Sequence, residues 1–74
     1  MKQGPVYALT DGATRWIWEF GRRGERHVYV DEDEDGTIID AGSVLGTHAT
    51  ESDIRAARKA TLDAIEDAEW NTGE

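Results

Sequence analysis

The fold is decided by residues 14–20, which read TRWIWEF. In an extended chain, where side chains alternate with a period of two, Trp16, Trp18 and Phe20 lie on one side and the intervening residues on the other. This alternation indicates a strand with one buried face. Two of the three tryptophans and the only phenylalanine fall within this stretch. It therefore predicts the strand around which the hydrophobic core forms.

The residues after this strand predict a second strand that pairs with it. Gly24 is placed for a three-residue turn, in which a type I turn is followed by a glycine with a positive φ angle. Such a turn sets Trp18 opposite Val28 and Trp16 opposite Val30. All the large apolar side chains then share one face, whereas a shift of one residue would send the valines to the other face.

Turn signals on both sides extend this pair into an antiparallel meander. An Asp-Gly pair at residues 11–12 predicts a two-residue type I′ hairpin turn, and residues 1–4 are expected to fray. After the acidic run 31–35 and Gly36, β-branched residues favour a further strand. Strands are expected at about 6–9, 14–20, 26–31 and 37–41.

The other face of the predicted sheet carries a mixture of polar and aromatic residues. The same register sets Arg15 opposite Asp31, a cross-strand pair of opposite charge. No other segment is predicted to cover this face, so it is either exposed to solvent or an interface. Its members are Arg15, Ile17, Glu19, His27 and Tyr29.

The last third of the sequence predicts one α-helix, at about 51–69. Thr50 is a favourable N-cap, and Asp53 follows three residues later at the capping-box position. An apolar stripe with helical spacing is formed by Ile54, Ala57, Thr61, Ile65 and Ala68. We therefore expect an α+β fold: one small domain over residues 1–74, in which a C-terminal helix packs on one face of an antiparallel three- to four-stranded β-meander.

The composition argues against several classes of function. With 74 residues and no cysteine, the chain has no disulfide and no thiolate metal site, and a core of this size supplies only about 3–5 kcal/mol. No apolar run is long enough for a membrane span or a signal peptide, so a cytoplasmic location without membrane contact is expected. No nucleophile elbow or phosphate-binding glycine loop is present. We therefore expect no enzyme activity, no cofactor and no metal.

The negative charge is concentrated in the second part of the chain. Residues 1–30 hold five basic and three acidic residues, whereas residues 31–74 hold three basic and thirteen acidic ones, within a net charge of −8. Such a surface is attracted to basic protein surfaces, many of which bind nucleic acid. Carboxylates spaced along a helix can imitate part of a row of phosphates. The residues expected to contact a partner are Asp31, Glu32, Asp33, Glu34, Asp35, Asp63, Glu66, Asp67 and Glu69.

The acidic run allows a second interpretation. Residues 31–36 read DEDEDG, which matches the start of a calcium-binding loop, and Ile38 is apolar at the eighth position as in EF-hands. The twelfth position, however, is Gly42 instead of a bidentate glutamate, and the flanking residues predict strands. The acidic run therefore has two possible explanations, a β-turn with Asp and Gly at favoured positions or a weak calcium site.

The first part of the chain allows a third interpretation. Arginines interleaved with aromatic residues are typical of nucleic-acid-binding faces. The total charge opposes such binding, so a small nucleic-acid-binding module is the alternative and not the leading hypothesis. Its residues would be Arg15, Arg22, Arg23, Arg26 and Tyr29.

In size, acidity and the combination of a Trp-x-Trp strand with a Thr-Glu-Ser-Asp start to an Ala-rich helix, the chain resembles small acidic phage-encoded inhibitors, among them anti-CRISPR proteins. The resemblance implies a non-enzymatic DNA mimic in the host cytoplasm, which blocks a CRISPR effector complex by occupying its DNA-reading surface. We expect a monomer or a weak homodimer that binds protein and not nucleic acid. Arg22, Arg23 and Arg26 depart from this type, because a pure DNA mimic has no need of a basic patch.

Overall fold

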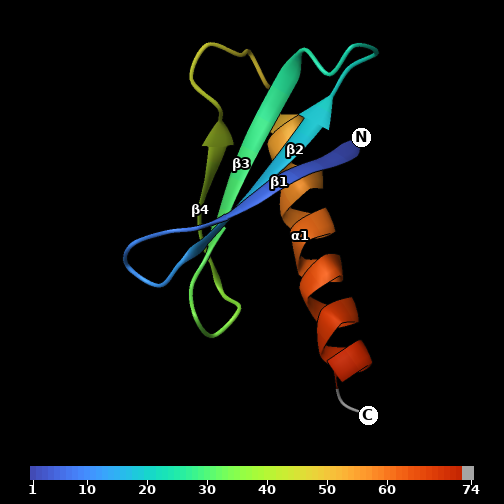
Figure 1. Cartoon of the computed structure of the whole chain (residues 1–74). Coiled ribbons are helices and arrows are strands. Elements are labelled where there is room, and N and C mark those ends of the chain that lie inside the picture. Colours follow the sequence, from blue (N-terminus) through green and yellow to red (C-terminus); the bar gives the residue numbers. More distant parts are fainter. Residues whose placement is uncertain (73–74) are drawn as a thin grey trace.

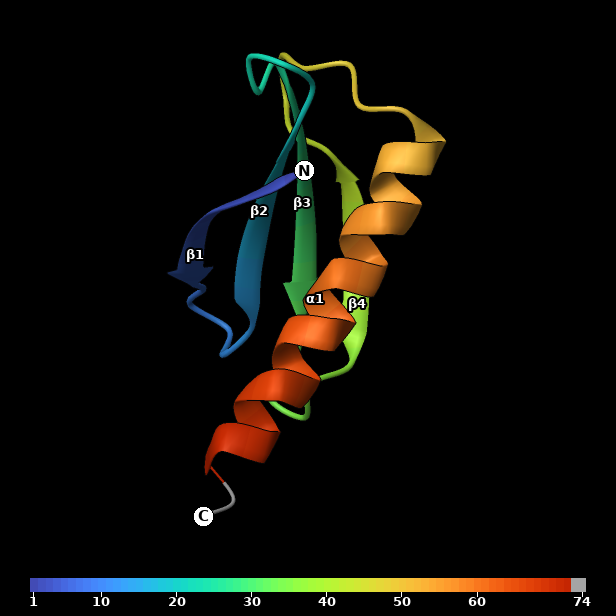
Figure 2. The same ribbon diagram turned by 90° about the vertical axis from the view of Figure 1, so that its right-hand side faces the viewer.

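The computed structural model describes residues 1–72, and the side chains as far as residue 68. A four-stranded antiparallel sheet has the order β1-β2-β3-β4, and one helix lies across one of its faces (Figures 1 and 2). The expected α+β fold is thus confirmed. The elements are β1 (Lys2–Ala8), β2 (Thr14–Phe20), β3 (Arg26–Glu32), β4 (Ile38–Ser43) and α1 (Glu51–Thr72).

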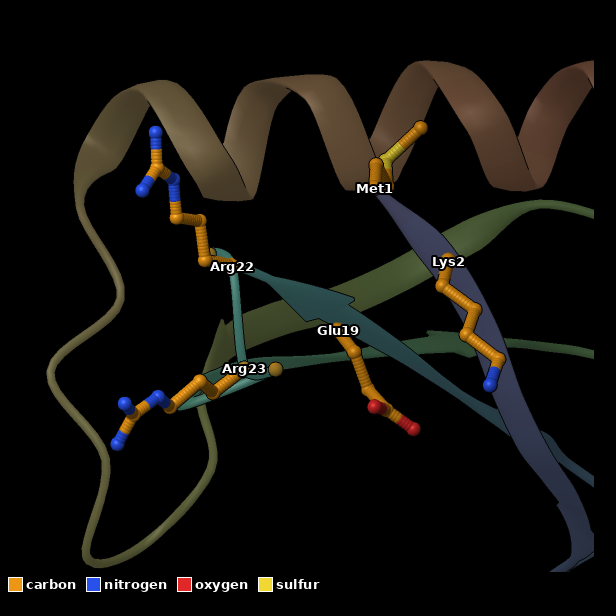
Figure 3. Close-up of a pocket in the computed structure, with 7 residues that line it drawn as sticks. Met1, Lys2, Glu19, Arg22 and Arg23 are labelled. Carbon is orange, nitrogen blue, oxygen red and sulfur yellow. The ribbon is translucent and has the colours of Figure 1, made fainter.

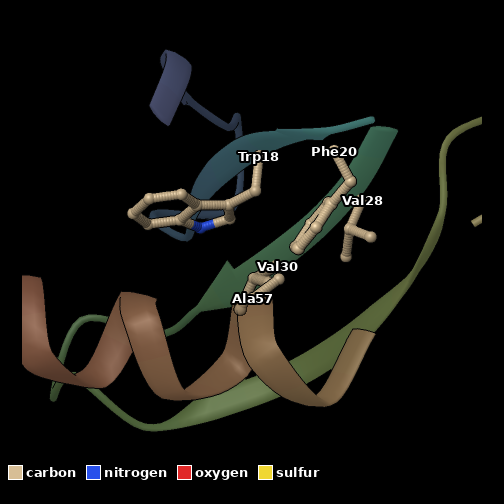
Figure 4. Packing of buried hydrophobic residues seen from close by; sticks show 5 residues of the cluster. All are labelled: Trp18, Phe20, Val28, Val30 and Ala57. Atoms are coloured by element: carbon tan, nitrogen blue, oxygen red, sulfur yellow. The ribbon is translucent and has the colours of Figure 1, made fainter. Parts of the chain in front are cut away.

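The predicted register of the central strand pair is confirmed. Trp18 lies opposite Val28, and Trp16 lies opposite Val30. Both valines are fully buried, and Trp18 is only 7% exposed. Trp18, the two valines and Phe20 form the core with Ala57 of the helix (Figure 4), and Trp16 packs against it. We call this helix side of the sheet the core face. The opposite side is the open face.

The three hairpin turns share one geometry, with a glycine of positive φ at Gly12, Gly24 and Gly36. The expectation of a two-residue type I′ turn at residues 11–12 is wrong, because that turn needs a positive φ at both central residues and Asp11 does not have one. Instead the N–H of Gly12 donates to the carbonyl of Leu9 at 3.2 Å. This is a type I turn followed by a glycine bulge, as predicted for the turn at Gly24.

The first strand is longer than the sequence predicted. It begins at Lys2 and pairs with β2, so the expected fraying of residues 1–4 is wrong. The pairing is interrupted by a bulge between Gln3 and Val6, next to Pro5. Proline has no N–H for a sheet hydrogen bond and occurs in edge strands and bulges. Because most of this edge strand is exposed, its polar residues carry no alternating pattern that would mark it as a strand.

The fourth strand ends two residues later than expected, and its two isoleucines point to opposite sides of the sheet. Ile38 packs against the core cluster, whereas Ile39 is 54% exposed. The strand runs on through Ser43, which pairs with Val28. It therefore forms the second edge of the sheet and supports one side of the helix.

The helix packs on β2, β3 and β4 through its small residues. Ala57 and Thr61 are fully buried. The Trp18 indole Nε1 donates to Thr61 Oγ1 at 2.8 Å, and this hydroxyl donates to the Ala57 carbonyl at 2.8 Å. Ala68, the last member of the predicted stripe, is exposed, and Figure 2 shows that the helix extends past the end of the sheet.

The N-terminus of α1 is closed by the predicted capping box. The Asp53 N–H donates to Thr50 Oγ1, and the Thr50 N–H donates to Asp53 Oδ2, both at 3.1 Å. Arg26 of β3 also donates to this carboxylate, with Nε 2.7 Å from Oδ2. The Arg26 hydrogen bond, together with the one from Thr50, lowers the pKa of Asp53 below its ordinary value of 3.8. One carboxylate thus joins the helix start to the sheet.

This lowered pKa predicts a pH dependence of stability. Because Asp53 holds its proton less tightly in the folded state, its contribution is present above the ordinary pKa and is lost as the pH falls through the folded-state pKa. The decrease in unfolding free energy from about pH 5 to about pH 3 should therefore be smaller in Asp53→Asn than in the parent protein. Urea unfolding at the two pH values measures it. The control is Asp63→Asn, which neutralises an exposed carboxylate on the same helix. If the decrease in unfolding free energy were reduced as much in Asp63→Asn as in Asp53→Asn, this role of Asp53 would be contradicted.

Candidate functional site

The structure brings the two predicted acidic segments together at one end of the molecule. The β3–β4 turn lies beside the second half of α1, in both views of the ribbon (Figures 1 and 2). A methyl group placed on Gly36 would lie 3.5 Å from Ile65 Cγ2, in ordinary van der Waals contact. Segments about thirty positions apart in sequence therefore lie side by side at this end of the molecule.

The β1–β2 turn adds a carboxylate that the sequence analysis considered only as a turn residue. Asp11 and Asp35 line one shallow hollow of about 280 Å³, together with Ile39. The side chain of Glu34 lies against Gly12 of that turn. The acidic end, as we name this end of the molecule, holds exposed carboxylates from three segments: Asp11, Glu34, Asp35, Asp63, Glu66 and Asp67.

Three of the predicted contact residues are used by the fold instead. Asp31 is only 6% exposed, and both its oxygens accept hydrogen bonds from Arg15, at 2.8 and 2.9 Å. Glu32 lies on the core face, where its Oε1 accepts from the Trp16 indole at 2.6 Å. Asp33 Oδ1 accepts two backbone N–H groups of its own turn, each at 2.9 Å.

The predicted contact residue Glu69 belongs to α1, but its side chain lies outside the described residues. The acidic end is accordingly defined without it. The helix supplies three of the predicted contact carboxylates, at residues 63, 66 and 67, all exposed. Of these three, Asp63 alone forms an ion pair within residues 1–68, with Lys59 Nζ 3.1 Å from Oδ2 across one helical turn.

The acidic run has the geometry of a hairpin turn and not of a calcium loop. The Asp33 N–H donates to the Thr37 carbonyl at 2.9 Å, and the Gly36 N–H donates to the Asp33 carbonyl at 3.1 Å. Asp31 and Glu32 point to opposite faces of β3, because side chains alternate along a strand. Within residues 1–68, no group of three or more potential ligand side chains is placed to hold a metal ion.

The residues of the predicted nucleic-acid-binding face are divided among three places. Arg15 stacks over Tyr29 on the open face, with its guanidinium carbon 4.6 Å from the ring centroid, and pairs with Asp31. Arg26 pairs with Asp53 at the helix start. Arg22 and Arg23 lie at the β2–β3 turn. On the open face, the partly exposed Arg15 is thus already neutralised by a buried carboxylate.

The open face is ordered by contacts among its own side chains. The Tyr29 hydroxyl donates to Asp40 Oδ2 at 3.1 Å, and this hydrogen bond raises the pKa of Tyr29 above its ordinary value. A broad hollow of about 620 Å³ lies beside these residues, with Tyr7, Ile17 and Val44 in its lining. Tyr29 and Arg15 point outward as the sequence predicted.

Comparison with protein-family models, curated proteins and solved structures found no significant match to this chain. Among the described residues, no helix has the length and apolar character needed to cross a membrane.

Proposed function

We propose that the protein is a non-enzymatic inhibitor that binds, through its acidic end, the basic DNA-reading surface of a larger complex such as a CRISPR effector. The observation that carries this proposal is the gathering of carboxylates from the β1–β2 turn, the β3–β4 turn and α1 at one end of the molecule. Apart from the Lys59–Asp63 pair, no cation among the described residues forms an ion pair there. The surface is therefore available to a positively charged partner.

The placement of charge on α1 supports a role in binding rather than in stability. Carboxylates near a helix C-terminus oppose the helix dipole, and the effect is largest within the last turn. The last turn of α1 holds no basic residue that would offset this. The dipole and the carboxylates thus add to a single negative end, which would attract a basic surface and accelerate association at low salt.

The spacing of these carboxylates is compatible with imitation of a nucleic-acid strand. Asp63 and Asp67 are four residues apart, which is about 6 Å along a helix axis. This is close to two phosphate steps of about 3.4 Å in one strand of DNA. An inhibitor that acts by covering the DNA-reading surface of its partner needs only such carboxylates and no catalytic residues of its own.

Charge reversal at the acidic end tests the proposal. The double variant Asp35→Lys/Asp67→Lys changes one exposed carboxylate from each acidic segment. Against purified CRISPR effector complexes, Cas9-type effectors included, the parent protein should compete with target DNA. The variant should associate about tenfold more slowly at low salt, with a weaker dependence on salt concentration. Biolayer interferometry gives the rates, and a DNA-binding assay gives the competition.

A matched variant separates the acidic end from net charge. Glu51→Lys makes the same change of charge at an exposed residue at the other end of α1, and is compared with the single variant Asp67→Lys. It should retain nearly the parent association rate. An equal loss in both variants would show that only total charge matters. Undiminished DNA binding by all effectors in excess parent protein would overturn the proposal itself.

A further inference from the structure

The end of the molecule opposite the acidic end carries a hollow of about 350 Å³. It lies between the start of β1 and the β2–β3 turn, and three of its side chains are cations: Lys2, Arg22 and Arg23 (Figure 3). Glu19 is its one acidic member. The molecule extends 38 Å along its longest axis, several times the screening length of about 8 Å at physiological salt. The acidic end therefore has little effect on an anion bound here.

Two arginines at this turn have no structural task. Arg22 and Arg23 occupy the central positions of the turn, which the Gly24 N–H closes by donating to the Gly21 carbonyl at 3.2 Å. Both are exposed, and no carboxylate among the described residues pairs with either side chain. Arg26, two residues after the turn, is by contrast held between Glu25 and Asp53. The turn thus presents two guanidinium groups that remain available.

Neither acidic side chain nearby, Glu25 or Glu19, forms an ion pair with these arginines among the described residues. Glu25 Oε1 accepts the Arg23 backbone N–H at 3.1 Å, and its other oxygen accepts from Arg26 at 3.4 Å. The Glu19 carboxylate lies over Gly24, where an added Cβ would come within 2.6 Å of Oε1. Glu25 thus supports the turn, and the two arginines are left to bind an anion.

We propose that this basic hollow binds the phosphate backbone of a nucleic-acid strand. Figure 3 shows Arg22 extending toward the first turns of α1, Arg23 extending outward from the turn, and Lys2 on the far side of Glu19. A single small anion cannot contact three cations that diverge in this way, whereas successive phosphates of one strand can. Guanidinium groups also match phosphate oxygens with two parallel hydrogen bonds. The choice of nucleic acid as the source of these phosphates rests on the proposed function, since a partner that reads DNA would hold a strand close to the bound protein.

The test uses the free protein and a single-stranded octathymidylate at low salt, followed by amide chemical shifts. The shifts should be largest in residues 21–25 and at the start of β1. Arg22→Gln/Arg23→Gln should weaken binding at least fivefold and reduce the log–log salt dependence by about 1–1.5, because each phosphate contact in a single strand contributes about 0.7. The matched control is Arg55→Gln/Arg58→Gln, which removes two exposed arginines from α1 and should bind like the parent.

Other outcomes would overturn the assignment. Equal weakening in the control would show that binding depends on total charge alone. Shifts of the same size with inorganic phosphate at equal phosphate concentration would exclude recognition of a strand. Absence of shifts in residues 21–25 would exclude the hollow. Because no effector is present in this experiment, its failure leaves the proposal for the acidic end unaffected, and the two failures are told apart.

Discussion

Replacement of Trp18 by alanine is expected to unfold the domain. The indole is 7% exposed and stacks on Trp16 with the ring centroids 6.3 Å apart. It also bonds to Thr61 across 43 positions of sequence. Removal of a buried aromatic side chain costs about 3–5 kcal/mol, and a core of this size supplies no more than about 3–5 kcal/mol in total. Circular dichroism should show loss of the cooperative thermal transition.

Two further variants separate the contribution of Trp18 to core packing from its hydrogen bond and from the contribution of Trp16. Trp18→Phe keeps most of the buried area and loses the hydrogen bond to Thr61, so it should remain folded with a lower melting temperature. Trp16→Ala removes a side chain that is only partly buried and should destabilise less than Trp18→Ala. A cooperative transition in Trp18→Ala close to that of the parent would contradict the central place of Trp18 in the core.

Arg15→Ala is expected to destabilise the protein more than Asp31→Ala does. The two side chains differ in exposure, with Arg15 at 40% and Asp31 at 9%. Removal of Arg15 leaves a buried carboxylate without a partner, opposite a second acid, Asp40, in the neighbouring strand. Removal of one partner from a fully buried pair costs about 3–5 kcal/mol. The exposure of Arg15 reduces this to about 2 kcal/mol, since solvent screens the pair.

Asp31→Ala leaves an arginine that can turn toward solvent, and its cost should stay below about 1 kcal/mol. Urea unfolding of the two single variants and the double variant gives the coupling energy between the two side chains. The double variant should be more stable than Arg15→Ala, because it removes the unpaired carboxylate. If the single variants were equally destabilised, the pair would be acting as an exposed ion pair.

The central part of the fold could be predicted because its residues allow one arrangement only. In β2 and β3, three aromatic residues and two valines occupy alternate positions, which fixes the buried face, and Gly24 fixes the turn between the two strands. The helix was predictable from Thr50, Asp53 and the spacing of its small residues. The first strand was not predictable to the same extent, since an exposed edge strand needs no pattern of apolar residues.

The acidic end could be predicted only in part. The run 31–35 is contiguous in sequence, yet β3 continues through Glu32 and sends Asp31 and Glu32 to opposite faces. The expected pairing of Arg15 with Asp31 already conflicted with a role for Asp31 in partner binding, and the structure resolves this in favour of the pair. The nearness of Asp11 to Asp35 depends on two turns packed side by side, which no local pattern reveals.

The order of the strands has a consequence for folding kinetics. Each strand pairs with its neighbour in sequence through a turn of the same type, so the sheet forms by closing short loops at little cost in chain entropy. Docking of α1 joins residues much farther apart, as the Trp18–Thr61 hydrogen bond illustrates. Because distant contacts slow folding, we expect helix docking to be the slow step. The acidic end, which requires both the β3–β4 turn and α1, is then the last part of the molecule to assemble.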